Sequence, residues 1–334
     1  MRLGKVSETV MNRSILKQLS SDGAERAVPL SVYEACAGIK KETSEDILFS
    51  DVSLCGGEEQ LGIFAIAQAV NQILAKGARP CGVSISIMMP PETEETFLQA
   101  LIRHISQCSS QWGIPVLCIR AEVSPAVNHT MIGATAVGAA ERDKLMLNYD
   151  KPAGRDIVLT KWIGMEGTLR ILRKEWESLS ERFVAVFLQG IEGWQDLLIA
   201  RKEVEIAREC GVKVIRQVTG GGIFAALWDL AAETGSGLEV KLDHMPIRQE
   251  TVELCEHFRI NPYQLTSSGC MLMLARDGGR LAGILKGSGI NAAVLGRITD
   301  GRDKVIYRGE EKRFLDRPAP DELLRLYDQR RIDR

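Results

Sequence analysis

The sequence contains no CxxC pair, no long apolar run and no excess of charge of either sign. Its eight cysteines stand singly, which indicates reduced thiols in a cytoplasmic protein rather than a disulfide framework. The apolar runs are interrupted well before the roughly 18 residues that a membrane span requires. The formal net charge is −2, so we expect neither a nucleic-acid surface nor a membrane surface. The first residues lack the apolar core of a signal peptide.

Two common nucleotide-binding motifs are also missing. The chain has no GxxxxGK[ST] segment, which excludes a P-loop, and no GxGxxG after an N-terminal strand, so a dinucleotide-binding fold has no support. The four histidines are not at zinc-ligand spacing with a cysteine pair. Any nucleotide site must therefore be built in another way.

Helical and strand patterns alternate along all 334 residues, which predicts an α/β (α+β) protein of two layered domains. In the first half, residues 47–53, 82–90, 115–123 and 129–140 have strand patterns, and residues 56–80 and 91–113 have helical ones. The polar segment LNYDKPAGRD (147–156) is the best boundary. The predicted domains are residues 1–150 and 151–334.

Three consecutive glycines, Gly220, Gly221 and Gly222, lie between a strand pattern and a helix pattern in VTGGGIFAALWDLA. Backbone N–H groups ahead of a helix bind anions well, because glycine allows close approach and the helix dipole favours negative charge. A tight turn that needs positive φ would require the same glycines. The local pattern leaves both interpretations open.

Several segments together resemble one family. VTGGGIFAALWDLAAETGSGLEVKLDHMPI resembles its "HD-x-T-x-GG" region, AVNQILAKGARP its "NDLA-x-x-GA-x-P" helix end, and ILFSDVS its "TTD" strand. AEVSPAVNHTMIGATAVG resembles its "GG-x-T" segment. The chain is identified by these motifs, in this order over residues 1–310, as similar to the aminoimidazole ribonucleotide (AIR) synthetase (PurM)-like superfamily. The nearest resemblance is to its AIR-synthase-related, or hydrogenase maturation factor HypE-like, subgroup.

The resemblance implies a PurM-like N-terminal domain that pairs with its twin to close a β-barrel, and a layered α/β C-terminal domain behind it. It implies ATP and Mg²⁺ in the groove between the domains, and activation or phosphorylation of a small molecule. Four apolar strand patterns in residues 1–150 present more apolar surface than two helices can cover, which independently predicts a homodimer.

The family's acidic positions are only partly kept. Asp51 and Glu122 match acidic positions and are the candidate Mg²⁺ ligands, although a strand-end turn and a solvated edge carboxylate explain them equally well. Asn71 matches the asparagine of "ND", but Gln72 replaces its aspartate, and Gln217 replaces the aspartate of "HD". Glutamine is neutral and a poor Mg²⁺ ligand, so the resemblance implies a partly eroded site.

Other candidates for the nucleotide site are cationic or hydroxyl side chains. Thr160 and Lys161 could contact a phosphate, or face solvent at a strand end. Arg120 and Arg216 could replace the charge of a lost metal, or be exposed arginines without such a role. Catalytic residues are not identified by the sequence.

Two functions remain possible on the sequence. One is an ATP-dependent enzyme that phosphorylates or activates a small molecule. The other is a non-catalytic dimer that binds a nucleotide or metabolite as a regulatory module, and the two glutamines favour it.

Overall fold

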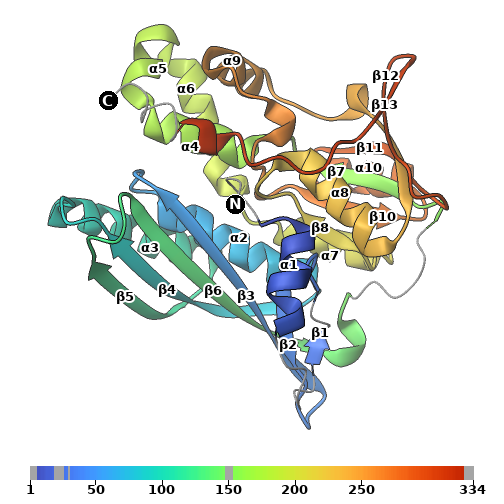
Figure 1. The fold of residues 1–334 in the computed structure, drawn as a ribbon, viewed down its shortest axis with the longest axis horizontal. Helices are drawn as coiled ribbons and strands as arrows, with labels where there is room; N and C mark the ends of the chain where they lie inside the picture. Colours follow the sequence, from blue (N-terminus) through green and yellow to red (C-terminus); the bar gives the residue numbers. More distant parts are fainter. Residues whose placement is uncertain (1–5, 19–25, 29–30, 147–152, 327–334) are drawn as a thin grey trace.

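A computed structural model of the chain describes residues 6–18, 26–28, 31–146 and 153–326. Most of the predicted domain boundary, residues 147–152, lies outside the described residues. Two sheets, each with its own helices, form the two parts of the molecule (Figure 1). No helix within the described ranges is long and apolar enough to cross a bilayer.

The N-terminal part is built on a six-stranded sheet in the order β1-β2-β3-β6-β4-β5. Neighbouring strands are antiparallel except for β4 and β5, which are parallel because α3 connects them. Its strands and helices are β1 (Arg26–Val28), β2 (Cys36–Ile39), β3 (Glu45–Gly56), β4 (Arg79–Met89), β5 (Val116–Val123), β6 (Thr130–Glu141), α1 (Glu8–Ser14), α2 (Leu61–Ala75) and α3 (Glu95–Trp112).

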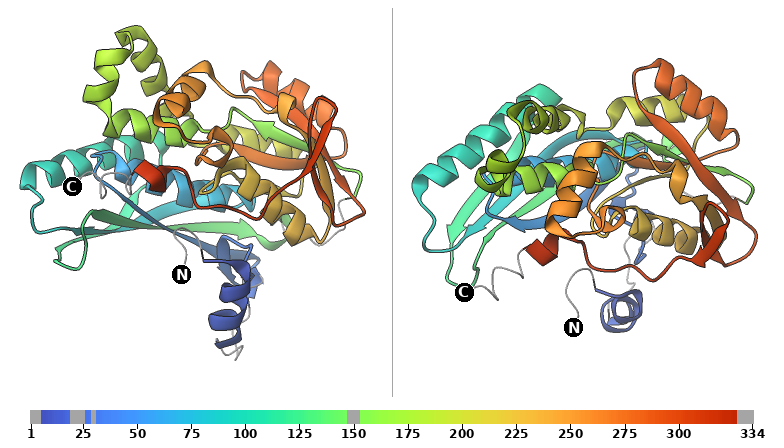
Figure 2. Two further views of the ribbon diagram at one scale, coloured as in Figure 1. Left: turned by 45° about the horizontal axis from the view of Figure 1, so that its top comes forward. Right: turned by 90° about the horizontal axis from the view of Figure 1, so that it is seen from above.

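Helix α2 lies between the two parts of the molecule. All of its residues except Gln72 are buried, because one side packs on β3 and β6 and the other on β8 and α7 (Figure 2, left). A helix with apolar residues on both sides is typical of such a doubly covered position. The two domains therefore share apolar core residues around α2.

The C-terminal part is built on a seven-stranded sheet in the order β13-β12-β9-β11-β7-β10-β8. Successive residues of β7 enter different cores, since Ile157 and Leu159 face one helical layer and Val158 faces the other. Its strands are β7 (Asp156–Thr160), β8 (Ile215–Gln217), β9 (Gly237–Lys241), β10 (Met271–Ala275), β11 (Ala292–Thr299), β12 (Lys304–Arg308) and β13 (Glu311–Phe314). Its helices are α4 (Met165–Lys174), α5 (Trp176–Arg182), α6 (Ala185–Glu192), α7 (Arg201–Glu209), α8 (Gly222–Thr234), α9 (Gln249–Phe258) and α10 (Gly278–Gly287).

After β13 the chain runs back across the C-terminal domain toward α4 (Figure 1). We call this segment, residues 315–326, the C-terminal strap. Its end is held by a hydrogen bond from Lys174 Nζ to the carbonyl oxygen of Leu326, 3.1 Å long. The strap brings residues from the end of the chain next to the first turn of α8.

The predicted two-domain α/β architecture is confirmed. The predicted barrel is not found in the single chain, where the N-terminal sheet is open and has β1 and β5 as its two edges. Helices α2 and α3 lie on one side of its long strands (Figure 2, left). Met88 and Met131 are exposed, as are Leu117 and Val123 of the edge strand β5. Pairing of two such sheets stays a prediction.

Candidate functional site

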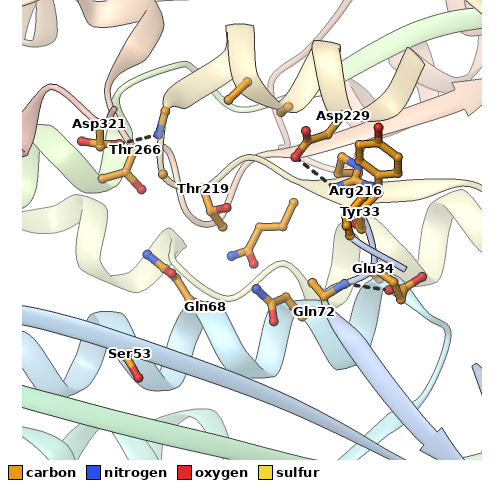
Figure 3. Close-up of a pocket in the computed structure, with 18 of the residues that line it drawn as sticks. Tyr33, Glu34, Ser53, Gln68, Gln72, Arg216, Thr219, Asp229, Thr266 and Asp321 are labelled. Atoms are coloured by element: carbon orange, nitrogen blue, oxygen red, sulfur yellow. Dashed lines mark hydrogen bonds and ion pairs between the residues drawn. The ribbon is translucent and has the colours of Figure 1, made fainter. Parts of the chain in front are cut away.

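A cavity of about 530 Å³ lies between the two domains, which both contribute to its walls. Helix α2, strand β8 and the first turns of α8 surround it, and the segment before β2 and the C-terminal strap complete it (Figure 3). Its polar lining includes the side chains of Gln68, Gln72, Gln217, Thr219 and Thr266. Pockets that bind small molecules commonly have volumes of this size.

The glycine turn forms one wall of this cavity. Gly221 has φ +84° and Gly222 has φ +66°, so the predicted tight turn before α8 is confirmed. A Cβ on Gly222 would lie 2.5 Å from the carbonyl oxygen of Tyr263, which excludes a larger residue. Gly220 and Gly221 line the cavity, but Gly222 does not. A phosphate contact at this turn stays a prediction.

A carboxylate of the strap already binds the turn. The backbone N–H of Gly221 donates to Asp321 Oδ2 at 2.8 Å, and that of Leu323 donates to Asp321 Oδ1 at 2.9 Å. Burial raises the pKa of Asp321 to about 6, against the opposing effect of these two hydrogen bonds. The helix N-terminus is therefore satisfied by an anion from within the chain.

The two glutamines at family aspartate positions lie in the same cavity. Ser50 Oγ donates to Gln72 Oε1, and Gln217 Nε2 donates to Ser268 Oγ at 2.6 Å. Gln217 is only 7 % exposed, and its Oε1 atom has no hydrogen-bond partner. A buried acceptor without a partner is unfavourable, so this atom is available to a donor on a ligand.

A buried carboxylate, Glu166 of α4, supports the floor of the cavity. Gln68 Nε2 donates to both of its oxygens at 2.9 Å, and Thr266 Oγ1 donates to Oε2 at 2.8 Å. Arg170 Nη1 lies 3.8 Å from Glu166 and its Nε pairs with Glu58 at 2.8 Å. Burial raises the pKa of Glu166, and Arg170 opposes that rise. This network fixes the amide of Gln68, a lining residue that the sequence analysis missed.

In the described part of the chain, the cationic side chains that line the cavity are all paired with acids. The pairs join Lys76 to Glu34 at 2.7 Å, Arg170 to Glu58 at 2.8 Å, and Arg216 to Glu233 at 2.5 Å and to Asp229 at 3.9 Å. Figure 3 shows the contacts of Arg216 and Glu34 at the edge of the cavity. Arg216, a predicted anion contact, thus has its charge neutralised by α8.

Two further predicted site residues, Asn71 and Thr160, lie outside the cavity. Asn71 is fully buried, where its Nδ2 donates to the carbonyl oxygen of Leu198 at 2.7 Å and its Oδ1 accepts from Ala200 N at 2.9 Å. These bonds tie α2 to the C-terminal domain. Thr160 is fully buried and its Oγ1 accepts from Met271 N at 3.0 Å.

Lys161 also serves the interior. It is 4 % exposed, and its Nζ pairs with Glu203 at 2.7 Å and donates to the carbonyl oxygens of Leu197 and Gly269. It therefore faces neither solvent nor the cavity. The expectation of a solvent-facing strand end is wrong, because the chain covers this end with the segment around Leu197.

The two candidate metal ligands lie far from each other. Asp51 aligns with Cys118 of β5 through β6 and β4, so it lies about 14 Å from that strand across the sheet. Glu122 lies four residues beyond Cys118, about 13 Å further along. Both carboxylates are exposed, and Asp51 Oδ1 accepts from Thr135 Oγ1 at 2.6 Å. Neither lines the cavity, and within one chain they cannot share a metal ion. Arg120 is likewise exposed on β5.

The cavity residues that sequence reasoning missed carry weak signals. Gln68 lies one helical turn before Gln72, so it shares the face of α2 that meets the cavity. Asp321 lies 100 residues from Gly221, and no local pattern links the two.

A second cavity, of about 550 Å³, lies on the other side of the strap. Ala319 lines both cavities, and the exposed Asp316 lines only the second one. The rings of Phe224 and Tyr263 stack in its wall with centroids 5.2 Å apart. The strap is thus a wall common to two cavities.

Two family models match the chain. AIR synthase related protein, N-terminal domain, matches residues 34–140, and AIR synthase related protein, C-terminal domain, matches residues 153–308. A protein of Methanocaldococcus jannaschii with the provisional name hydrogenase expression/formation protein is 23% identical, over 97% of both chains. Carbamoyl dehydratase HypE of Rhodobacter capsulatus is 23% identical, over 76% of this chain and 74% of its own.

Solved structures have the same fold. The hydrogenase maturation protein HypE in complex with ATP superposes with a TM-score of 0.68 at 18% identity, over 95% of this chain and 96% of that one. AaThiL complexed with AMPPCP and TMP superposes with a TM-score of 0.68 at 17% identity, over 93% and 96%. Together the two family models match well over half of the chain, from strand β2 to the end of β12. The chain therefore belongs to the AIR synthase related protein family, and its relatives include HypE-like proteins.

Proposed function

We propose that this protein binds a nucleotide or a related small molecule in the cavity between its domains, and that it turns over Mg²⁺–ATP slowly or not at all. One observation carries the proposal. The cavity combines the glycine turn with Gln72 and Gln217, which stand where the family resemblance expects Mg²⁺-binding aspartates.

The relatives support a nucleotide as the ligand. HypE has been solved with ATP and AaThiL with AMPPCP, and both share the fold of this chain. This chain has a cavity of about 530 Å³ lined by both domains, a size common among pockets for small molecules. We therefore take ATP as the first nucleotide to test.

The residues present do not fit a magnesium ion in the cavity. Among the described residues, no three His, Cys, Asp or Glu side chains come together as a metal site would need. The two glutamines offer neutral oxygens, whereas Mg²⁺ bound with substrate phosphates needs carboxylates. The acids Asp229, Glu233 and Glu34 are paired with cations. We assign no chemical step to the metal.

An ATP-dependent enzyme that activates or phosphorylates a small molecule is the second candidate. The similarity to carbamoyl dehydratase HypE and the retained turn from Thr219 to Gly221 favour it. Removing one charged group from a phosphoryl-transfer site would slow such a reaction by about two orders of magnitude. Measured turnover separates the two candidates.

The homodimer remains part of the proposal, with the N-terminal sheets facing each other. The exposed side chains of Met88, Met131, Leu117 and Val123 supply apolar surface for this contact. Light scattering at micromolar concentration should give twice the chain mass, and a monomer there would reject the dimer. The eight free cysteines fit the cytoplasm as the proposed location.

The test of function is a thermal-shift screen of nucleotides and nucleosides, with and without Mg²⁺, followed by an assay of ATP hydrolysis. A ligand at 100 times its Kd stabilises the native state by about 2.7 kcal/mol, which a thermal shift detects. We expect binding without a requirement for Mg²⁺ and little hydrolysis. Hydrolysis at rates ordinary for ATP-using enzymes would favour the second candidate. The absence of any shift would reject the cavity as a nucleotide site.

A further inference from the structure

The glycine turn of the cavity holds a carboxylate in the position where a phosphate would bind. Asp321 accepts the N–H of Gly221 at 2.8 Å, and one of its oxygens lies 4.0 Å from the position that a Cβ on Gly220 would take. Gly221 directly precedes helix α8, so Asp321 lies at the positive end of the helix dipole. The carboxylate of Asp321 therefore already occupies the position at the turn that would attract a ligand anion.

Among the described residues, the rest of the cavity offers a phosphate no free positive charge. Its three cations, Lys76, Arg170 and Arg216, are each paired with an acid at 2.8 Å or less. A phosphate at the turn would meet the like charge of Asp321 in a partly buried site, where screening by water is weak. Either the phosphate stays out or the strap must move.

What the cavity does offer is hydrogen bonding to uncharged groups. The side chains of Gln68 and Gln72 line it beside the hydroxyl of Thr219. Gln217, more than nine-tenths buried, has an Oε1 atom without a partner. A ligand N–H or O–H at Gln217 Oε1 would satisfy this acceptor. These groups suit the base and sugar of a nucleoside.

We propose that Asp321 is a specificity-determining residue, which holds the anion position of the glycine turn and thereby selects uncharged nucleosides over their phosphates. The inference rests on the proposed function, because it takes this cavity as the ligand site. The inference predicts that the protein binds a nucleoside without a metal ion. In this respect the chain would differ from a protein in which a phosphate of the ligand occupies the glycine turn.

The charge of Asp321 can be varied with pH. Burial raises the pKa of Asp321 to about 6, and its two backbone hydrogen bonds oppose the rise. Two charged residues of α4 also act on this pKa: Glu166 raises it and Arg170 lowers it. The carboxylate is thus ionised at pH 7.5 and mostly protonated at pH 5.5. Discrimination against a phosphate should weaken over the same range.

The experiment compares adenosine with the methyl ester of AMP, whose single negative charge is constant over this pH range. Calorimetry without metal ions gives the ratio of the two affinities for the wild type, Asp321→Asn and Asp316→Asn. Asp316 is a matched control, because it is an exposed carboxylate on the same strap that lines the other cavity. We expect the wild type to prefer adenosine, and Asp321→Asn to shift the ratio toward the ester by about tenfold or more.

Asp316→Asn should leave the ratio unchanged. If Asp321→Asn does not fold, the wild type gives the same information, since the ratio should shift toward the ester roughly sixfold between pH 7.5 and 5.5. A wild type that prefers the ester at pH 7.5, or a ratio that neither Asp321→Asn nor pH changes, would overturn this inference and leave the proposed function standing. No binding of adenosine, the ester or ATP to any of the proteins would reject both.

Discussion

Replacing Asp321 by asparagine should change the pH dependence of stability. Burial raises the pKa of this carboxyl from the ordinary 3.8 to about 6. A raised pKa means that the folded state holds its proton more tightly than the unfolded state. The carboxyl therefore costs no stability below about pH 4, and costs increasingly more as the pH rises to about 6. The difference between the two pKa values corresponds to at most about 3 kcal/mol.

Asparagine removes this titration but fits the site less well. One amide oxygen can accept from Gly221 or from Leu323, while the amide nitrogen faces the other N–H, at a cost of about 1 kcal/mol. We expect Asp321→Asn to be less stable than the wild type by about 1 kcal/mol at pH 4 and more stable by about 1–2 kcal/mol at pH 7.

Urea unfolding from pH 4 to 7.5 gives this difference directly, and carboxyls common to both proteins cancel. Asp316→Asn, which removes an exposed carboxylate of the same strap, is the control. If the difference between Asp321→Asn and the wild type is constant over this range, the carboxyl has no raised pKa and the reasoning fails.

Three further predictions concern residues around the two domains. Gln72→Asp combined with Gln217→Asp should raise Mg²⁺ affinity measured by calorimetry, and unchanged affinity would refute the assignment of these positions to a lost metal site. Lys161→Met should lower the free energy of unfolding by about 3–5 kcal/mol, because it leaves Glu203 buried without its partner. A decrease in nucleotide affinity at unchanged stability would instead show that Lys161 contacts the ligand. Asn71→Ala should lower the unfolding free energy by about 1–3 kcal/mol because it removes two buried hydrogen bonds, and a stability equal to the wild type's would show that these bonds do not hold the domains together.

The sequence predicted the long helices and strands of the N-terminal domain, because their patterns are local, but it missed the short strands β1 and β2. The period of two in residues 82–90 follows from a strand with one covered face, and the three glycines follow from a turn with positive φ. Gln72 and Gln217 were placed in one site through the family resemblance, and they do line one cavity.

The parts that sequence reasoning did not reach depend on contacts between distant residues. A lysine at a strand end is expected to be exposed to solvent. Lys161 is buried because the segment around Leu197 packs over it, and this contact is visible only in the structure. Asp321 meets Gly221 across 100 residues, and the pairing of each cation with an acid depends on the same tertiary fold. The arrangement of charged groups around the cavity could therefore not be predicted from the sequence.

The burial of α2 on both sides has a consequence for the order of synthesis. Its sheet-facing side can be covered as soon as β6 has been made, but its other side waits for the C-terminal domain. The first partner of Asn71 in that domain, Leu198, follows 127 residues later. At about 5–20 residues per second, that delay is roughly 6–25 s on the ribosome. During this time an apolar helix face is uncovered, so the nascent N-terminal domain is a natural client for a chaperone.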